Sequence, residues 1–167
     1  MKIRYTPLKD VVVVESVCHD DSRGHFQELY SHDKCDDPAQ QNWKQINWSH
    51  SKSNVLRGIH CAPYQKLVMC LSGRVWDVVV DLRKDSKTYL EWYGMWLDHK
   101  TQMFVPGGCG HGYYAEEESD VVYMQNCAWD ENIESNYHWM SFGIEWPESE
   151  EYVISDKDEN AKKYGYG

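Results

Sequence analysis

A chain of 167 residues that is 41% hydrophobic and 14% aromatic fits one globular domain, expected over residues 1–167, and excludes a disordered composition. Seventeen lysines and arginines against 27 aspartates and glutamates give a net charge of −10, which argues against nucleic acid or an anionic membrane as a partner. The sequence has no apolar run of bilayer-spanning length and its N-terminus lacks the features of a signal peptide, so we expect a cytoplasmic protein with no membrane partner.

Short strand-like segments recur along the chain with turn residues about every ten positions, as in β-sandwiches and barrels. They cover residues 11–17, 26–30, 43–49, 55–60, 66–71, 74–82, 89–97, 102–105, 112–115, 121–127 and 143–146. A polar cluster at residues 19–24 is expected to end the first strand. The polar segment 33–41 predicts a turn at Asp36-Asp37-Pro38 and one turn of helix.

Helix signals are weak until the C-terminus. There Ser155-Asp156-Lys157-Asp158 has a capping-box pattern that predicts a short helix through Lys163. The sequence therefore predicts an all-β sandwich or barrel with a short C-terminal helix.

The six cysteines show no disulfide or zinc pattern. Cys18, Cys35, Cys61, Cys70, Cys109 and Cys127 form no Cys-x-x-Cys pair and have no zinc-like spacing. We expect reduced thiols rather than disulfides or metal ligands.

The stretch 54–68 combines Arg57, His60 and Lys66 between apolar runs. In a regular strand, Arg57 and Ile59 would share one face, and Gly58 and His60 the other. A histidine base beside two cations suits proton abstraction from an anionic substrate. A surface histidine between two solvated cations is the alternative, and this stretch alone does not decide between the two.

A second informative stretch follows the strand at 102–105. Its pattern Pro-x-Gly-x-x-His, ending at His111, resembles the second motif of the cupins, which are double-sheet jelly rolls. Metal-binding cupins also carry a His-x-His pair and a glutamate, whereas the corresponding stretch here holds only His60. Two histidines without a third ligand make a poor metal site, so we expect none.

Nine motifs taken together form an ordered series, and the match runs from about residue 11 to residue 158. The motifs are Arg23-Gly24-x-Phe26-x-Glu28, Gln45-x-Asn47-x-Ser49, Arg57-Gly58-Ile59-His60, Lys66-Leu67-Val68, Gly73-x-Val75-x-Asp77-x-x-x-Asp81-Leu82-Arg83, Pro106-x-Gly108-x-x-His111-Gly112, Tyr123, Gly143-Ile144-x-Trp146 and Ile154-Ser155-x-Lys157-Asp158. This series resembles the dTDP-4-dehydrorhamnose 3,5-epimerase family. The resemblance implies an all-β, cupin-type double-sheet jelly roll that forms a homodimer and uses no metal or cofactor. It also implies inversion of carbons next to the C4 ketone of a nucleotide-linked 4-keto sugar.

The same resemblance implies the catalytic roles. His60 would be the base and Asp158 its carboxylate partner. Lys66 would hold the enolate oxygen, and Tyr123 would be the acid on the other face of the sugar. Most tyrosines in apolar strands are packing residues, so the role of Tyr123 depends on its place in the series.

Substrate-binding positions are implied in the same way: Arg23, Phe26, Glu28, Gln45, Asn47, Arg57, Asp77, His111 and Trp129. Arg23 and Arg57 would grip the diphosphate, because arginine suits bidentate phosphate contact. Trp129 would stack on the nucleotide base, although it and Phe26 could instead be core aromatics. Asp77 would either contact substrate or hold Lys66. Asp81 and Arg83, at the end of a strand, are expected to be structural.

The chain also departs from the family pattern. Only five residues separate His60 from Lys66, and Cys61 and Ala62 stand where an aromatic residue and a glutamine are usual. Met124 replaces a frequent lysine. The nucleotide, the sugar and the number of inverted carbons therefore stay open. The alternatives are a nucleotide-sugar 3,4-ketoisomerase, a non-catalytic sugar-binding cupin and a metal-dependent cupin oxygenase.

Overall fold

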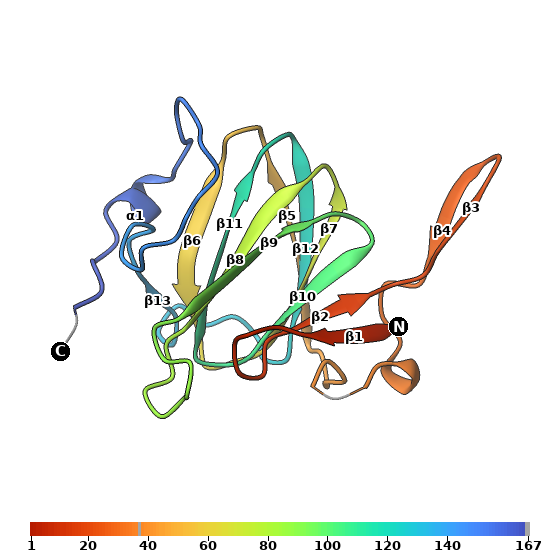
Figure 1. The fold of residues 1–167 in the computed structure, drawn as a ribbon, viewed down its shortest axis with the longest axis horizontal. Coiled ribbons are helices and arrows are strands. Elements are labelled where there is room, and N and C mark those ends of the chain that lie inside the picture. Colours follow the sequence, from red (N-terminus) through yellow and green to blue (C-terminus); the bar gives the residue numbers. More distant parts are fainter. Residues whose placement is uncertain (37, 166–167) are drawn as a thin grey trace.

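The computed structural model describes residues 1–36 and 38–165 and is built from antiparallel β-sheets (Figure 1). The strands of the described part are β1 (Lys2–Tyr5), β2 (Val12–Glu15), β3 (Cys18–Asp21), β4 (Gly24–Gln27), β5 (Gln45–Ser51), β6 (Leu56–Cys61), β7 (Lys66–Ser72), β8 (Val75–Asp81), β9 (Trp92–Leu97), β10 (Thr101–Val105), β11 (Cys109–Ala115), β12 (Ser119–Gln125) and β13 (Ser135–Asn136). The two helices described are a 3-10 turn, η1 (His32–Lys34), and α1 (Asp156–Glu159), and neither has the length or apolar character needed to cross a bilayer.

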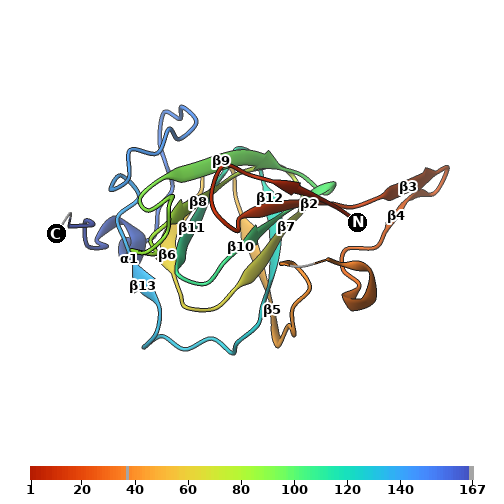
Figure 2. The same cartoon turned by 60° about the horizontal axis from the view of Figure 1, so that its bottom comes forward.

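Two large sheets face each other. One has the order β1-β2-β10-β7-β12-β5 and the other β13-β6-β11-β8-β9. Figure 2 shows them as the two walls of a flattened barrel. The predicted all-β, double-sheet architecture is confirmed.

Apolar side chains fill three layers. The central layer lies between the sheets and includes Val13, Val68 and Val79. A second layer covers the outer face of the six-stranded sheet, and a third the outer face of the five-stranded sheet. Because both faces are buried around the central strands, a strand such as β2 is continuously apolar instead of alternating, whereas edge strand β5 alternates.

Several sequence predictions were wrong in detail. Residues 143–146 form no strand, because the chain turns at Gly143, whose φ is +63°, and Ile144 and Trp146 pack on the outer face of the five-stranded sheet. The polar cluster 19–24 does not end a strand but lies within the β3–β4 hairpin, and β4 ends at Gln27 rather than at residue 30. The helix α1 ends at Glu159 rather than Lys163.

The remaining predicted strands are confirmed to within a few residues. Sequence analysis missed β1, β3 and β13, which are short. The helical turn expected in 33–41 is η1, one residue earlier than predicted. Part of the turn expected at Asp36-Asp37-Pro38 falls on Asp37, which lies outside the described residues. All six cysteines lie among the described residues and are unpaired thiols, as predicted.

One hairpin leaves the body of the molecule. Strands β3 and β4 pair only with each other and project away from the two sheets in both views (Figures 1 and 2). We call residues 18–27 the arm. Its tip carries Arg23, and Phe26 on β4 is 71% exposed.

The C-terminal segment returns to the sheets beside β6. Leu56 donates a backbone hydrogen bond to the carbonyl of Val153 at 3.0 Å, and α1 follows at once. Ser155 caps this helix, since its side chain accepts from the backbone N–H of Asp158 at 3.2 Å. The cap holds Asp158, which is 4% exposed, against β6 (Figure 1).

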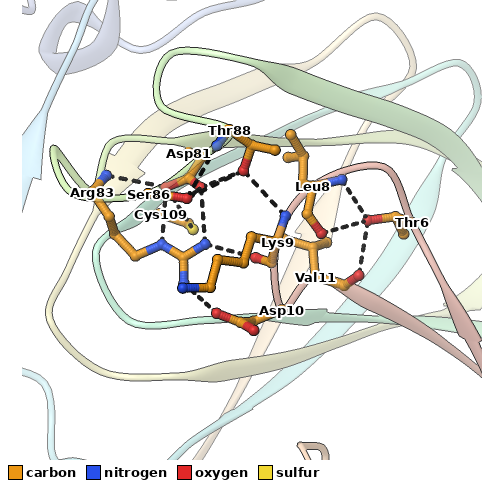
Figure 3. Close-up of polar contacts among 10 residues, drawn as sticks. All are labelled: Thr6, Leu8, Lys9, Asp10, Val11, Asp81, Arg83, Ser86, Thr88 and Cys109. Atoms are coloured by element: carbon orange, nitrogen blue, oxygen red, sulfur yellow. Dashed lines mark hydrogen bonds and ion pairs between the residues drawn. The ribbon is translucent and has the colours of Figure 1, made fainter.

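A buried carboxylate joins the β1–β2 and β8–β9 turns (Figure 3). Asp81 is fully buried and accepts hydrogen bonds from Arg83, Ser86 and Thr88. Arg83 in turn donates to the carbonyl of Lys9 at 2.6 Å. Burial raises the pKa of Asp81, but these hydrogen bonds outweigh it and hold the pKa well below its usual range. Asp81 and Arg83 thus have the structural role predicted for them.

Replacing Asp81 with asparagine is expected to lower the free energy of unfolding by about 3 kcal/mol near pH 7, because Arg83 would lose its buried charge partner. The folded-state pKa of Asp81 lies below its unfolded value, so the stabilisation is present above the unfolded pKa. It is lost as the pH falls through the folded pKa. Denaturant unfolding at several pH values should therefore show the gap between wild type and variant narrowing in acid.

The exposed neighbour Asp85 is the matched control, and Asp85→Asn should leave stability nearly unchanged. Equal stability of wild type and Asp81→Asn at pH 7 would contradict the assignment.

Candidate active site

A cavity of about 140 Å³ opens between the two sheets. Strands β5, β7 and β12 of one sheet and β6 and β11 of the other supply its walls. Its lining residues are Ser49, Arg57, His60, Lys66, His111, Gly112, Tyr113 and Tyr123. Five of these are among the predicted site residues, contributed by four different strands.

A β-bulge in β6 sets the direction of the Arg57 and His60 side chains. Arg57 pairs with Tyr113, and His60 pairs with His111, so β6 has one more residue than β11 between the two pairs. Such a bulge reverses the alternation of side chains beyond it. Both Arg57 and His60 therefore line the cavity, and the expectation that they lie on opposite faces of a regular strand was wrong.

Gly58 makes the bulge possible. Its φ is +117°, and a Cβ atom there would lie 2.6 Å from the Cα of Gly112. Only glycine accepts both the conformation and the close approach of β11.

His60 and Asp158 form a hydrogen-bonded pair. The distance from His60 Nε2 to Asp158 Oδ1 is 2.8 Å, and Asp158 Oδ2 accepts from the backbone N–H of Gly58 at 3.2 Å. Burial raises the pKa of Asp158, but His60 and the Gly58 N–H outweigh it and lower the pKa overall. An ionised carboxylate only accepts, so in neutral His60 the proton sits on Nε2 and the lone pair on Nδ1. Nδ1 can then act as a base.

Lys66 begins β7 and is 8% exposed. Burial lowers the pKa of its ammonium group, while the charges of Glu134, Cys61 and Asp77 act in the opposite direction. A buried cation attracts a developing negative charge more strongly than a solvated one does. The side chain is therefore suited to holding an oxyanion.

The turn before Lys66 is held in place by the turn at residues 106–108. Gly108 donates a backbone hydrogen bond to the carbonyl of Ala62 at 2.8 Å. A Cβ atom on Gly107 would collide with the carbonyl of Pro63. The turn 62–65 and the turn 106–108 therefore pack backbone against backbone, which fixes the separation of His60 and Lys66.

His111 is paired with a second carboxylate. Its Nε2 lies 2.7 Å from Asp77 Oδ1, and Asp77 is fully buried behind it and does not line the cavity. Among the described residues, Asp77 Oδ2 has no hydrogen-bond partner. The structure thus places Asp77 in a supporting position beside His111.

Tyr123 faces the cavity from β12, in the sheet opposite to that of His60. Burial raises the pKa of its hydroxyl, the charge of Glu134 and the hydroxyl of Tyr113 add to the rise, and Arg57 opposes it. The hydroxyl consequently keeps its proton at neutral pH and can donate it.

A hydroxyl network holds Arg57. Its Nε donates to Ser51 Oγ and its guanidinium to the carbonyl of His50, both at 3.0 Å. The Tyr113 hydroxyl lies 2.9 Å from Ser51 Oγ and 3.1 Å from Ser49 Oγ. The guanidinium is therefore fixed at the wall of the cavity.

Sequence analysis missed Glu134. Its Oε1 lies 4.0 Å from His60 Nδ1, and its Oε2 accepts from Trp129 Nε1 at 3.1 Å. Its side chain is only 11% exposed. Glu134 lies in an irregular segment without periodicity, where Glu131 is equally acidic, so only the fold distinguishes the two.

The predicted nucleotide-side residues form a polar row beyond the cavity. Gln45 donates to Asn47 at 2.7 Å, and the two lie on one face of edge strand β5. Gln45 also accepts from the backbone N–H of Trp129 at 2.8 Å. Trp129 is 53% exposed, so it is not a core aromatic.

Three predicted residues lie away from this cavity. Arg23 pairs with Asp21 at the tip of the arm and its side chain is 88% exposed. Phe26 is exposed on the arm, and Glu28 pairs with Lys34 at 2.8 Å just beyond it. Within one chain, the structure does not bring them to the other site residues.

Comparison with known proteins points to one family. The family model for dTDP-4-dehydrorhamnose 3,5-epimerase matches residues 5–165. The chain is 35% identical to the dTDP-4-dehydrorhamnose 3,5-epimerase of Shigella flexneri, over 98% of this chain and 96% of the relative.

Two solved structures are informative. A dTDP-6-deoxy-D-glucose-3,5-epimerase from Legionella pneumophila, in complex with dTDP-4-keto-L-rhamnose, is 31% identical with a TM-score of 0.91, covering 96% of this chain and 91% of that one. A 3'-monoepimerase from Streptomyces bikiniensis, in complex with dTDP-quinovose, is 26% identical with a TM-score of 0.85, covering 95% of this chain and 85% of that one.

Proposed function

The chain belongs to the dTDP-4-dehydrorhamnose 3,5-epimerase family. We propose that its cavity inverts carbons of a nucleotide-linked 4-keto sugar, with His60 removing a proton from the carbon and Tyr123 returning one to its other face. The protein is an isomerase of the nucleotide-sugar epimerase class. One observation carries the residue assignment: a base paired with a carboxylate and a protonated phenol line the same cavity from opposite sheets.

In the proposed reaction, His60 Nδ1 removes a proton from the carbon next to the C4 ketone. The C–H electron pair moves into the ring and the ketone becomes an enolate. Asp158 stabilises the imidazolium, and buried Lys66 binds the enolate oxygen. Tyr123 then delivers a proton to the opposite face of that carbon. The imidazolium of His60 then releases its proton to solvent and Tyr123 takes one up, so no protons or electrons are gained or lost overall.

The nucleotide side of the substrate would lie along the row formed by β5. Arg57, whose side chain is held by Ser51, would bind the diphosphate, and His111 would line the same cavity as a polar neighbour. The half-exposed ring of Trp129, tied to Gln45, can stack on the base. By analogy with the Legionella complex, we propose a dTDP-linked sugar.

The arm supports a homodimer. Arg23 and Phe26 are exposed on a hairpin that projects from the body, and Glu28 follows directly (Figure 1). They can meet a substrate only in the cavity of another copy, so we propose that two chains exchange arms. We also propose that the enzyme is cytoplasmic, where its six unpaired thiols would stay reduced.

Proton NMR of nucleotide-linked 4-keto sugars in D₂O tests the function. The panel should hold 4-keto-6-deoxyhexoses and 4-keto heptoses on different nucleotides. Deuterium is expected to enter at C3, C5 or both, with inversion at the same carbon. Exchange confined to one carbon would indicate a monoepimerase, the activity of the Streptomyces bikiniensis relative. Carbonyl migration, or the absence of exchange with every sugar, would reject the proposal.

A further inference from the structure

The arm carries a second group of side chains that the epimerase reaction does not use. Cys18, Asp20 and His25 each offer one ligand atom, and these atoms all lie within 4.8 Å of one another. We propose that they bind a divalent transition-metal ion, with Zn²⁺ as the best match.

Strand pairing creates this ligand set. Asp20 lies directly opposite His25, and Cys18 lies opposite Gln27, so the three ligands share one face of the hairpin. The other face carries His19 and Phe26, which are paired with each other. This ligand set cannot be recognised as a sequence motif, because the β3–β4 register, and not a Cys-x-x-Cys pattern, brings the three side chains together.

The distances need only small adjustments. Zinc bonds of about 2.0–2.3 Å in a tetrahedron place two ligand atoms roughly 3.3–3.8 Å apart. Cys18 Sγ is already 3.9 Å from Asp20 Oδ1. Because the side chains are exposed or half-buried, rotamer changes can close the remaining gap.

The chemistry of the donors selects the metal. One sulfur, one imidazole nitrogen and one carboxylate oxygen form a mixed set of the kind that zinc uses, whereas Mg²⁺ and Ca²⁺ prefer oxygen ligands alone. The ring of His99 stacks on His25 with centroids 5.2 Å apart, so a further imidazole lies next to this ligand set and could complete it.

The ion would stabilise an element that has little other support within its own chain. A two-stranded hairpin outside a sheet is marginally stable in water. The arm is tied to the body near its base, where Gln27 donates to the carbonyl of His99 at 2.6 Å. A metal bound across β3 and β4 would hold the two strands together while leaving the face with Phe26 uncovered.

Cobalt titration of the tag-free, reduced full chain tests the site. Co²⁺ is expected to bind with a sulfur-to-cobalt charge-transfer band, and Zn²⁺ should displace it. Cys18→Ser should remove the band, and Cys18→Ser and His25→Ala should each weaken binding roughly tenfold or more. Cys127→Ser, which removes another exposed thiol, and His19→Ala, on the opposite face of the arm, should bind like wild type.

Hydrogen exchange gives a second readout. Zn²⁺ should slow exchange of the amides in residues 18–27 of the wild type but not of Cys18→Ser. Binding that survives both Cys18→Ser and His25→Ala, or no thiolate band in the wild type, would overturn the proposal. The test does not involve the sugar substrate, so its outcome is independent of the epimerase assignment.

Discussion

Replacing His60 with asparagine is expected to abolish deuterium exchange at the substrate carbons and to lower turnover roughly 10²–10⁴-fold. Asparagine keeps a polar group that can contact Asp158, but it cannot accept the proton. Tyr123 and Lys66, which also line the cavity, are poor substitutes, because the pKa of Tyr123 is raised and Lys66 is proposed as the partner of the enolate oxygen. The measurement is NMR exchange in D₂O with the substrate identified for the wild type.

His32→Asn is the matched control, since His32 is exposed outside the cavity and its replacement should leave exchange unchanged. Exchange by His60→Asn at the wild-type rate would show that another group is the base.

The variant His60→Asn, combined with Arg23→Ala, also tests arm exchange between subunits. Arg23→Ala should weaken substrate binding through the arm, whereas His60→Asn removes the base of its own cavity. If each cavity uses the partner's arm, a mixture of the two variants should be more active than either alone at low substrate concentration, because some mixed dimers contain one intact site. A mixture that is no more active than either variant after subunits have demonstrably exchanged would contradict the homodimer arrangement.

Replacing Tyr123 with phenylalanine is expected to separate proton removal from inversion. His60, Asp158 and Lys66 remain, so the substrate proton should still exchange with solvent through the enolate. Without the phenol on the opposite face, inversion of at least one carbon should fall roughly 10²-fold or more. Deuterium would then appear at a carbon whose configuration is retained, which NMR distinguishes from the inverted product.

Tyr93→Phe provides the control for loss of a strand tyrosine hydroxyl outside the cavity. Normal inversion by Tyr123→Phe would place the acid elsewhere.

Much of the fold could be predicted from sequence because the core strands have strong local patterns. The runs in β2, β7 and β8 are largely apolar, β2 and β8 being rich in valine, and their positions were confirmed. The segment 143–146 also carries apolar side chains, Ile144 and Trp146, yet it covers a sheet instead of joining it. Apolar residues indicate burial, and burial alone does not distinguish a strand from a loop that packs on one.

The cavity was predictable only in part, because it depends on contacts between distant segments. The residues His60, Lys66, Tyr123 and Arg57 were identified through an ordered resemblance, and the structure brings them together. The bulge in β6 was not predictable, because it shows only in the pairing with β11. Glu134 reaches His60 from a segment that has no regular structure of its own.

The close backbone contact between Gly107 and Pro63 limits how this enzyme could evolve toward other sugars. In this chain the turn between His60 and Lys66 packs backbone against backbone on the turn at residues 106–108, so a longer turn here requires a matching change in the facing turn. Edge strand β5 and the arm carry side chains toward solvent and tolerate substitution without moving the proton-transfer residues. Selection can therefore alter what the enzyme recognises at the periphery while it inherits an unchanged reaction from its ancestors.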